Sequence, residues 1–124
     1  MCRIKIYKHR DFFKWANNEN ISDDLLKQVV FELEQGSFGA KLGRYLYKKR
    51  VARIGTGKRG GYRTLIAFRS QDKAIFIYGF AKNVKPNVTW KEKCLVKELA
   101  NYYLGLTQAQ LSQLLKKQRL IEVL

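Results

Sequence analysis

Hydrophobic and polar residues alternate at the start of the chain. Ile4 and Ile6 fall on one side of the alternation, and Arg3, Lys5 and Tyr7 fall on the other. Because successive side chains of a strand point to opposite faces, this period of two predicts a first β-strand.

A helical spacing follows from Asp11, with Phe12 and Trp15 on the same side. Ser22 is a suitable N-cap for a second helix, whose apolar residues then recur every three or four positions until Gly36. The pattern therefore predicts a strand followed by two helices.

The middle of the chain returns to strand-like composition. Three segments are rich in β-branched and aromatic residues, namely Tyr45 to Ile54, Tyr62 to Arg69 and Ala74 to Phe80. The segment Ser70 to Lys73 has the composition of a turn between the last two. These segments predict an antiparallel β-meander.

The last third of the chain, from about residue 89 to 124, reads as helical. Thr89 with Glu92, and Thr107 with Gln110, have the spacing of two capping boxes, and each precedes leucines at helical intervals. The predicted fold is α+β, with β-α-α first, then the meander, then C-terminal helices. At 124 residues it is expected to be one domain over residues 1–124.

Charge narrows the possible partners. The chain has 25 Lys and Arg against 10 Asp and Glu, a formal net charge of +15. Such a surface attracts polyanions, of which nucleic acid is the commonest, although an acidic protein, a membrane surface or simple solubility are alternative explanations.

Cysteine and histidine point to no metal site or disulfide framework. Cys2 and Cys94 lie far apart, and His9 is the single histidine. We therefore expect neither a metal nor a cofactor. No signal peptide or membrane-spanning run is evident, so the expected location is the cytoplasm, without a membrane partner.

A glycine-rich segment, Gly55-x-Gly57-x-x-Gly60, resembles a dinucleotide-binding fingerprint in spacing alone. That motif requires a preceding strand and a following helix, whereas a strand follows here. A Walker A loop is excluded because Lys58 is followed by Arg59 instead of Ser or Thr. What remains is a basic strand connection that either binds anions or is merely a solvated hairpin.

The run KRGGYR (residues 58–63), then TLIAF, then FIYGFAKN (Phe76 to Asn83) resembles the HigB-like branch of the RelE/ParE toxins of type II toxin–antitoxin systems. The resemblance extends over most of the chain and implies a RelE-like fold. It also implies a ribosome-dependent messenger RNA endonuclease, or mRNA interferase, that a cognate antitoxin, expected to be of helix-turn-helix type, keeps inactive. Cleavage would be metal-independent, because the RNA 2′-OH is itself the nucleophile.

The resemblance implies Arg63, Lys58 and Lys82 as catalytic residues, with Arg63 stabilising the transition state. A lysine whose pKa is lowered by neighbouring cations is a candidate general base. This chain departs from the family pattern after Lys82, where Val84 and Lys85 stand in place of an acidic residue and an arginine.

Four further residues are expected to bind RNA. Arg53 is implied by its resemblance to basic residues that RelE-type enzymes carry late on this strand. Arg59 would neutralise phosphate, and Tyr78 and Phe80 would stack on a base. The alternative interpretation makes the aromatic residues part of the core and Arg53 and Lys82 ordinary surface charges.

A second class of function is compatible with the same fold. In this alternative the protein would be a non-catalytic binder, either a ParE-like gyrase inhibitor or a nucleic-acid-binding adaptor. ParE-like toxins generally lack the nuclease's set of cations, so Arg63 with Lys58 and Lys82 favours the nuclease.

Overall fold

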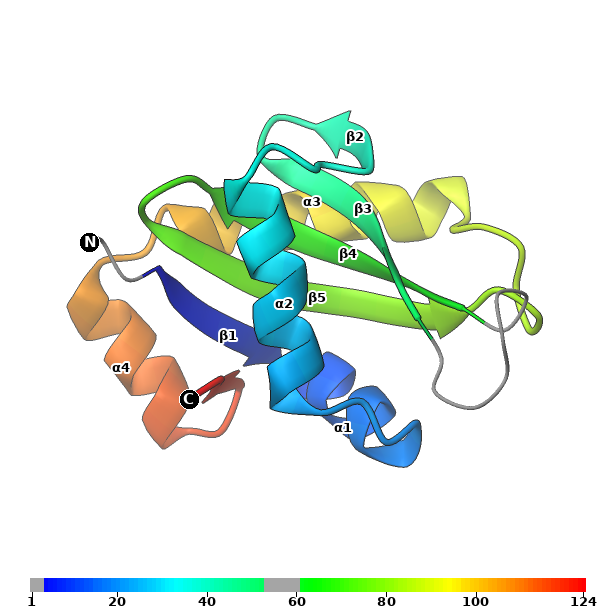
Figure 1. The fold of residues 1–124 in the computed structure, drawn as a ribbon. Coiled ribbons are helices and arrows are strands. Elements are labelled where there is room, and N and C mark those ends of the chain that lie inside the picture. Colours follow the sequence, from blue (N-terminus) through cyan, green and yellow to red (C-terminus); the bar gives the residue numbers. More distant parts are fainter. Residues whose placement is uncertain (1–3, 53–60) are drawn as a thin grey trace.

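The computed structural model describes residues 4–52 and 61–124, which form a six-stranded sheet with helices on both faces (Figure 1). The strands are β1 (Lys5–His9), β2 (Ala40–Gly43), β3 (Leu46–Val51), β4 (Tyr62–Arg69), β5 (Lys73–Ala81) and β6 (Leu120–Glu122). The helices are α1 (Arg10–Asn18), α2 (Asp23–Glu34), α3 (Trp90–Leu104) and α4 (Gln108–Lys116). None of these four helices has both the length and the apolar character needed to cross a membrane.

The strand order is β2-β3-β4-β5-β1-β6. Strands β3, β4 and β5 form the predicted antiparallel meander, β1 adds to β5 in parallel, and β6 pairs antiparallel with β1. The predicted α+β fold is therefore confirmed.

The predicted helix starts are also confirmed. The Ser22 hydroxyl accepts a hydrogen bond from the Leu25 N–H at 3.2 Å. Both capping boxes form, the first between Thr89 and Glu92 and the second between Thr107 and Gln110. Each cap satisfies backbone N–H groups that the first turn of a helix leaves without partners.

Two short strands escaped the sequence pattern. Strand β2 has four residues and ends in glycine, and β6 has only three residues directly after α4, so neither shows a usable alternation. The predicted strand from Tyr45 to Ile54 is observed as β3, while Arg53 and Ile54 lie outside the described residues.

A separate apolar core covers each face of the sheet. Helices α1 and α2 pack on one face, where Phe12, Leu26 and Phe76 are buried. Helices α3 and α4 pack on the other, over Tyr7 and Leu65. Tyr7 is 1% exposed although it falls on the polar side of the N-terminal alternation, because the second helical layer covers that side of β1.

Helix α1 approaches β5 closely because residue 79 is glycine. A Cβ atom at Gly79 would lie 2.2 Å from the ring of Trp15. The Trp15 ring also makes an edge contact with Tyr62 at a centroid distance of 5.3 Å, which ties α1 to the start of β4.

Two buried lysines hold α2 across the sheet. Lys8 of β1 forms an ion pair with Asp23 at 2.8 Å, and Lys49 of β3 forms one with Glu32 at 2.9 Å. Both lysine side chains are nearly inaccessible, so each needs an acidic partner to offset the cost of burying its charge. The pairs fix the first and last turns of α2 over two different strands.

Replacing Glu32 with glutamine tests this constraint. Because Lys49 would stay buried without a carboxylate, we expect the free energy of unfolding at pH 7 to fall by about 1–2 kcal/mol, less than for a fully buried pair because the Glu32 side chain is 41% exposed. Urea denaturation of Glu32→Gln and wild type measures this difference, with the exposed Glu98→Gln as the control.

The difference should depend on pH. The hydrogen bond from Lys49 lowers the pKa of Glu32 from its ordinary 4.5. The stabilisation is therefore complete above the ordinary pKa and is lost as the pH falls through the lowered one. A difference that is the same at pH 3 and pH 7 would contradict the proposed role of this ion pair.

Candidate functional site

The strand register places two arginines directly opposite each other. Arg50 of β3 pairs with Arg63 of β4, and Arg63 in turn pairs with Phe80 of β5. Paired residues on adjacent strands point to the same face, so these three side chains share the face that α3 covers in part. A Cβ atom at the buried Gly61 would lie 3.6 Å from Arg63 Nη1 and 3.7 Å from Arg50 Cγ, so both side chains reach the same point.

The charges of the two arginines oppose each other. Burial, and then the charge of Arg50, lower the pKa of Arg63 from its ordinary value. No carboxylate of residues 4–52 and 61–124 forms an ion pair with either guanidinium. The hydrogen bond from Arg63 Nη1 to the Tyr62 carbonyl, at 3.4 Å, leaves other donors of its fork available. Two adjacent cations without an acid attract an anionic group such as phosphate.

A bulge in β5 brings an aromatic pair to this face. Leu65 pairs with Tyr78 and Ile66 pairs with Phe76, so Ile77 is an extra residue and the alternation shifts by one. Tyr78 is half-buried, with its ring centroid 6.0 Å from that of Phe80. Phe80 is 5% exposed, which agrees with the alternative interpretation of a packed aromatic and leaves Tyr78 as the accessible member of the pair.

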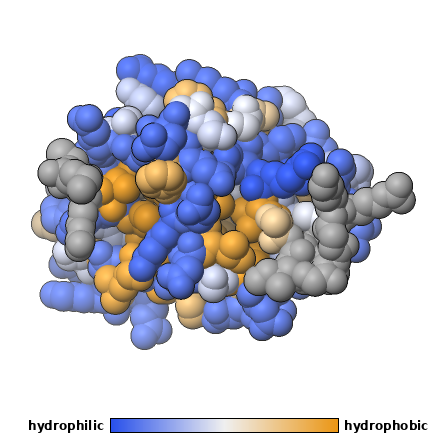
Figure 2. All heavy atoms as spheres, in the orientation of Figure 1, coloured by the Kyte–Doolittle hydropathy of each residue, from blue (hydrophilic) through white to orange (hydrophobic). Residues whose placement is uncertain are grey.

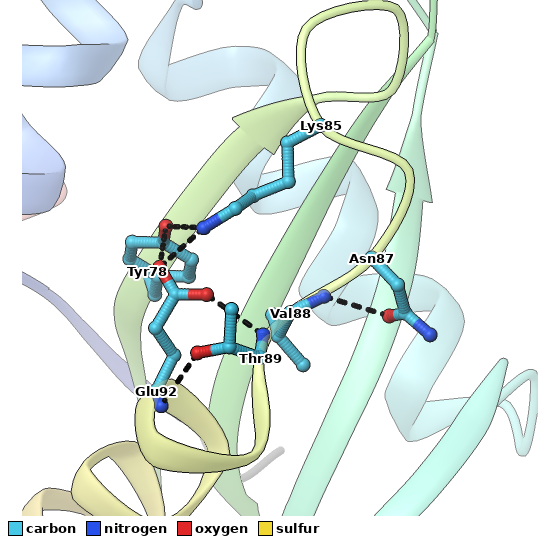
Figure 3. A network of polar contacts seen from close by, with 6 residues as sticks. All are labelled: Tyr78, Lys85, Asn87, Val88, Thr89 and Glu92. Carbon is cyan, nitrogen blue, oxygen red and sulfur yellow. Dashed lines mark hydrogen bonds and ion pairs between the residues drawn. The ribbon is translucent and has the colours of Figure 1, made fainter.

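Beside the aromatic pair, three polar side chains form a network between β5 and α3 (Figure 3). Tyr78 donates a hydrogen bond to Glu92 Oε2 at 2.5 Å, and Lys85 Nζ donates to the Tyr78 hydroxyl at 3.2 Å. Lys85 also forms an ion pair with Glu92 Oε2. The other oxygen, Glu92 Oε1, accepts the Thr89 N–H at 2.8 Å in the capping box. Glu92 therefore fixes the start of α3 and the segment that carries Lys85.

The network fixes the charge of each member. The hydrogen bond from Lys85, followed by that from the Thr89 backbone, lowers the pKa of Glu92 to about 2. Burial, and then the Glu92 hydrogen bond, raise the pKa of Tyr78, while Glu92 and Tyr78 raise that of Lys85. At neutral pH the network thus holds an anion, a cation and a neutral phenol.

The structure brings some of the predicted site residues together. Lys82 is exposed just after β5, and its N–H donates to the Gly61 carbonyl at 3.2 Å, which places Lys82 beside the strand that carries Arg63. Arg53, Lys58 and Arg59 lie outside the described residues.

Sequence reasoning missed Arg50 and the role of Glu92. Arg50 joins the site through the β3–β4 register, which no spacing along the chain reveals. Glu92 was found as a helix cap, but its contact with Tyr78 depends on how α3 packs on the sheet.

Replacing Glu92 with glutamine separates its charge from its capping role. Glutamine caps α4 in the same way at Gln110, so Glu92→Gln should keep the helix start and lose the pairing with Lys85. We expect the free energy of unfolding at pH 7 to fall by about 1–2 kcal/mol, toward the lower end of what charge-assisted hydrogen bonds contribute because the Glu92 side chain is 28% exposed.

That loss should shrink as the pH falls from 4.5 toward the lowered pKa of about 2, where wild-type Glu92 becomes neutral as well. Chemical denaturation across this pH range measures it, with Glu98→Gln as the control. A constant difference would show that the charge of Glu92 is not responsible.

Comparison with known proteins agrees with the fold. The family model described as the RelE toxin of the RelE / RelB toxin-antitoxin system matches residues 4–123, from β1 through β6. No curated protein gave a match. The chain therefore belongs to the RelE toxin family and is the toxin component of a toxin–antitoxin system.

Proposed function

We propose that this toxin is a HigB-like endoribonuclease that cleaves messenger RNA on the ribosome in the cytoplasm and so inhibits translation. The observation that carries the proposal is the pair Arg50 and Arg63, two cations in register with no carboxylate partner in the described parts of the chain. A phosphodiester bound between them would offset their repulsion. The net charge of +15 supports the approach of a polyanion.

The proposed chemistry uses the nucleophile that RNA already carries. The 2′-oxygen attacks the neighbouring phosphorus, its proton passes to a base, and the bond from phosphorus to the 5′-oxygen breaks as that oxygen takes up a proton. The products are a 2′,3′-cyclic phosphate and a 5′-hydroxyl end. No metal-bound nucleophile is needed, so the protein supplies orientation and positive charge.

Arg63 would stabilise the charge that develops on the phosphate, because it is half-buried and pairs with Arg50 across the strands. Lys82 would neutralise phosphate at the start of β4, next to Gly61. Lys58 as a catalytic residue, and Arg53 and Arg59 as RNA contacts, stay proposals that rest on the family resemblance.

A lysine is a better candidate for the general base than Tyr78 or Glu92 of the polar network. A neutral Tyr78 with a raised pKa holds its proton, and Glu92 with a pKa of about 2 is a weak base already engaged by Lys85. Tyr78 is better suited to contact a base of the RNA, with Phe80 packed beside it.

The proposal includes an antitoxin of helix-turn-helix type. RelE family membership implies an antitoxin. From the HigB-like resemblance we infer that its gene lies next to the toxin gene, downstream of it. An acidic antitoxin would gain speed of association with a protein of net charge +15.

Removing the Arg63 guanidinium tests the proposed nuclease. We expect Arg63→Ala to lower the cleavage rate about 100- to 1,000-fold, as for the loss of one group that stabilises an oxyanion, and Arg50→Ala to lower it by a smaller factor. Mapping of mRNA 5′ ends in a translation extract containing ribosomes measures the rate, with Lys27→Ala on the opposite face of the sheet as the control.

Intact mRNA at a wild-type dose that stops protein synthesis would contradict the proposal. If DNA supercoiling by gyrase were blocked at that dose, the ParE-like alternative would replace it.

A further inference from the structure

We propose that the antitoxin docks on the free edge of β6 as an added β-strand with acidic side chains. The inference rests on membership of the RelE toxin family, which supplies the partner, and is independent of the proposed cleavage chemistry. It is carried by the backbone of β6, the hollows beside that strand and the charges around them.

The backbone of β6 faces outward at two residues. Among the described strands, β6 pairs with β1 alone, through Glu122 with Tyr7, Ile121 with Lys8 and Leu120 with His9. The Val123 N–H donates to the Ile6 carbonyl at 2.9 Å, at one end of this ladder. Along an antiparallel strand, the backbone N–H and C=O groups of successive residues point alternately toward one neighbouring strand and away from it. The backbone groups of Ile121 therefore also point toward β1, whereas those of Leu120 and Glu122 point away from it.

No other strand of the described chain lies beyond β6, which is the last in the sheet order (Figure 1). Exposed strand edges are templates for pairing with another chain, and many proteins recognise extended segments in this way. The outward groups of Leu120 and Glu122 thus offer main-chain hydrogen bonds to a partner.

Helices from both faces of the sheet turn this edge into a slot. A hollow of about 470 Å³ lies against Leu120, Ile121 and Glu122. Phe13 of α1 and Leu115 of α4 line it as well, and these helices belong to opposite faces of the sheet. Since side chains alternate along a strand, a partner strand would place one row against Phe13 and the next against Leu115.

A second hollow extends the same edge. It has a volume of about 610 Å³, shares Glu122 with the first, and is lined by Ile4, Ile6 and Leu124. Figure 2 shows hydrophobic residues reaching the surface on both sides of α2, on the face where Ile4 and Ile6 pack. The two hollows together form a surface longer than a single side chain would fill.

The charges around the two hollows favour an acidic partner. Arg10 and Lys14 line the first hollow, Lys5 and Lys27 line the second, and among the described residues Glu122 is the only acid lining either. An acidic segment complements these four cations. A second copy of this chain would instead bring another +15 against them, which disfavours pairing of two β6 edges.

The test uses the antitoxin co-expressed with the toxin from its neighbouring gene, then separated in denaturant and refolded. Glu122→Pro removes one outward N–H and spares the bonds of Ile121 and Val123 to β1, while Glu122→Ala is the matched control. We expect the proline variant to bind about 10-fold or more weakly than the alanine variant, which corresponds to one lost main-chain hydrogen bond in a formed interface.

Amide hydrogen exchange provides the second measurement. In the wild-type complex, the amides of Leu120 and Glu122 should become protected, and in the free Glu122→Pro variant the β1 amides should exchange as in wild type, which shows that the sheet is intact. Lys14→Glu should slow association, whereas Lys97→Glu on α3 should change it less.

Equal affinity of the proline and alanine variants, or unchanged exchange at Leu120 and Glu122 in the complex, would overturn the proposal. Protection of these amides in a toxin dimer or by a single-stranded RNA, but not by the antitoxin, would overturn it as well. All readouts are binding measurements without substrate, so a toxin that proved not to cleave RNA would leave the outcome unaffected.

Discussion

The fold depends on how a few carboxylates are shared among many cations. Against 25 Lys and Arg the chain has 10 Asp and Glu, and two of these acids, Asp23 and Glu32, serve lysines buried in the sheet. A third buried lysine, Lys73, relies on the Leu106 carbonyl at 3.4 Å. Because burial of an unpaired charge costs more free energy than a surface ion pair contributes, Asp23 and Glu32 stabilise the fold more by pairing with buried lysines than they would at the surface. The remaining cations give the surface its excess charge.

The two faces of the sheet differ in how many acidic residues they carry. Six of the ten acids lie in residues 10–39, on or near α1 and α2, which together cover one face. The opposite face carries Arg50 and Arg63, and among the described residues Glu92 is the acid in contact with the neighbouring Tyr78 and Lys85. A polyanion would therefore be attracted more strongly to the face with the paired arginines than to the face that α1 and α2 cover.

Local patterns sufficed for most of the elements but not for the assembled site. Alternation predicted β1, and β-branched and aromatic composition predicted β4 and β5. The N-cap Ser22 and two capping boxes predicted the starts of α2, α3 and α4, since these signals act within a few residues. Arg63 and Lys82 were identified from the family resemblance. Arg50 could not be predicted because its place depends on the pairing of two strands, and the bulge at Ile77 also appears only in that pairing. Strand β6 was missed because three residues give no period.

The two carboxylate oxygens of Glu92 connect the start of α3 with the side chains of Lys85 and Tyr78. One oxygen closes the first turn of α3, and the other holds Lys85 and Tyr78 beside the cationic face. An anion that drew Lys85 away would leave this carboxylate less restrained and so loosen the helix start. By thermodynamic reciprocity, anything that stiffens the first turn of α3 would strengthen the hold on Lys85 and weaken the anion's grip. The Glu92 carboxylate would thus couple the order of the first turn of α3 to the affinity of Lys85 for an anion.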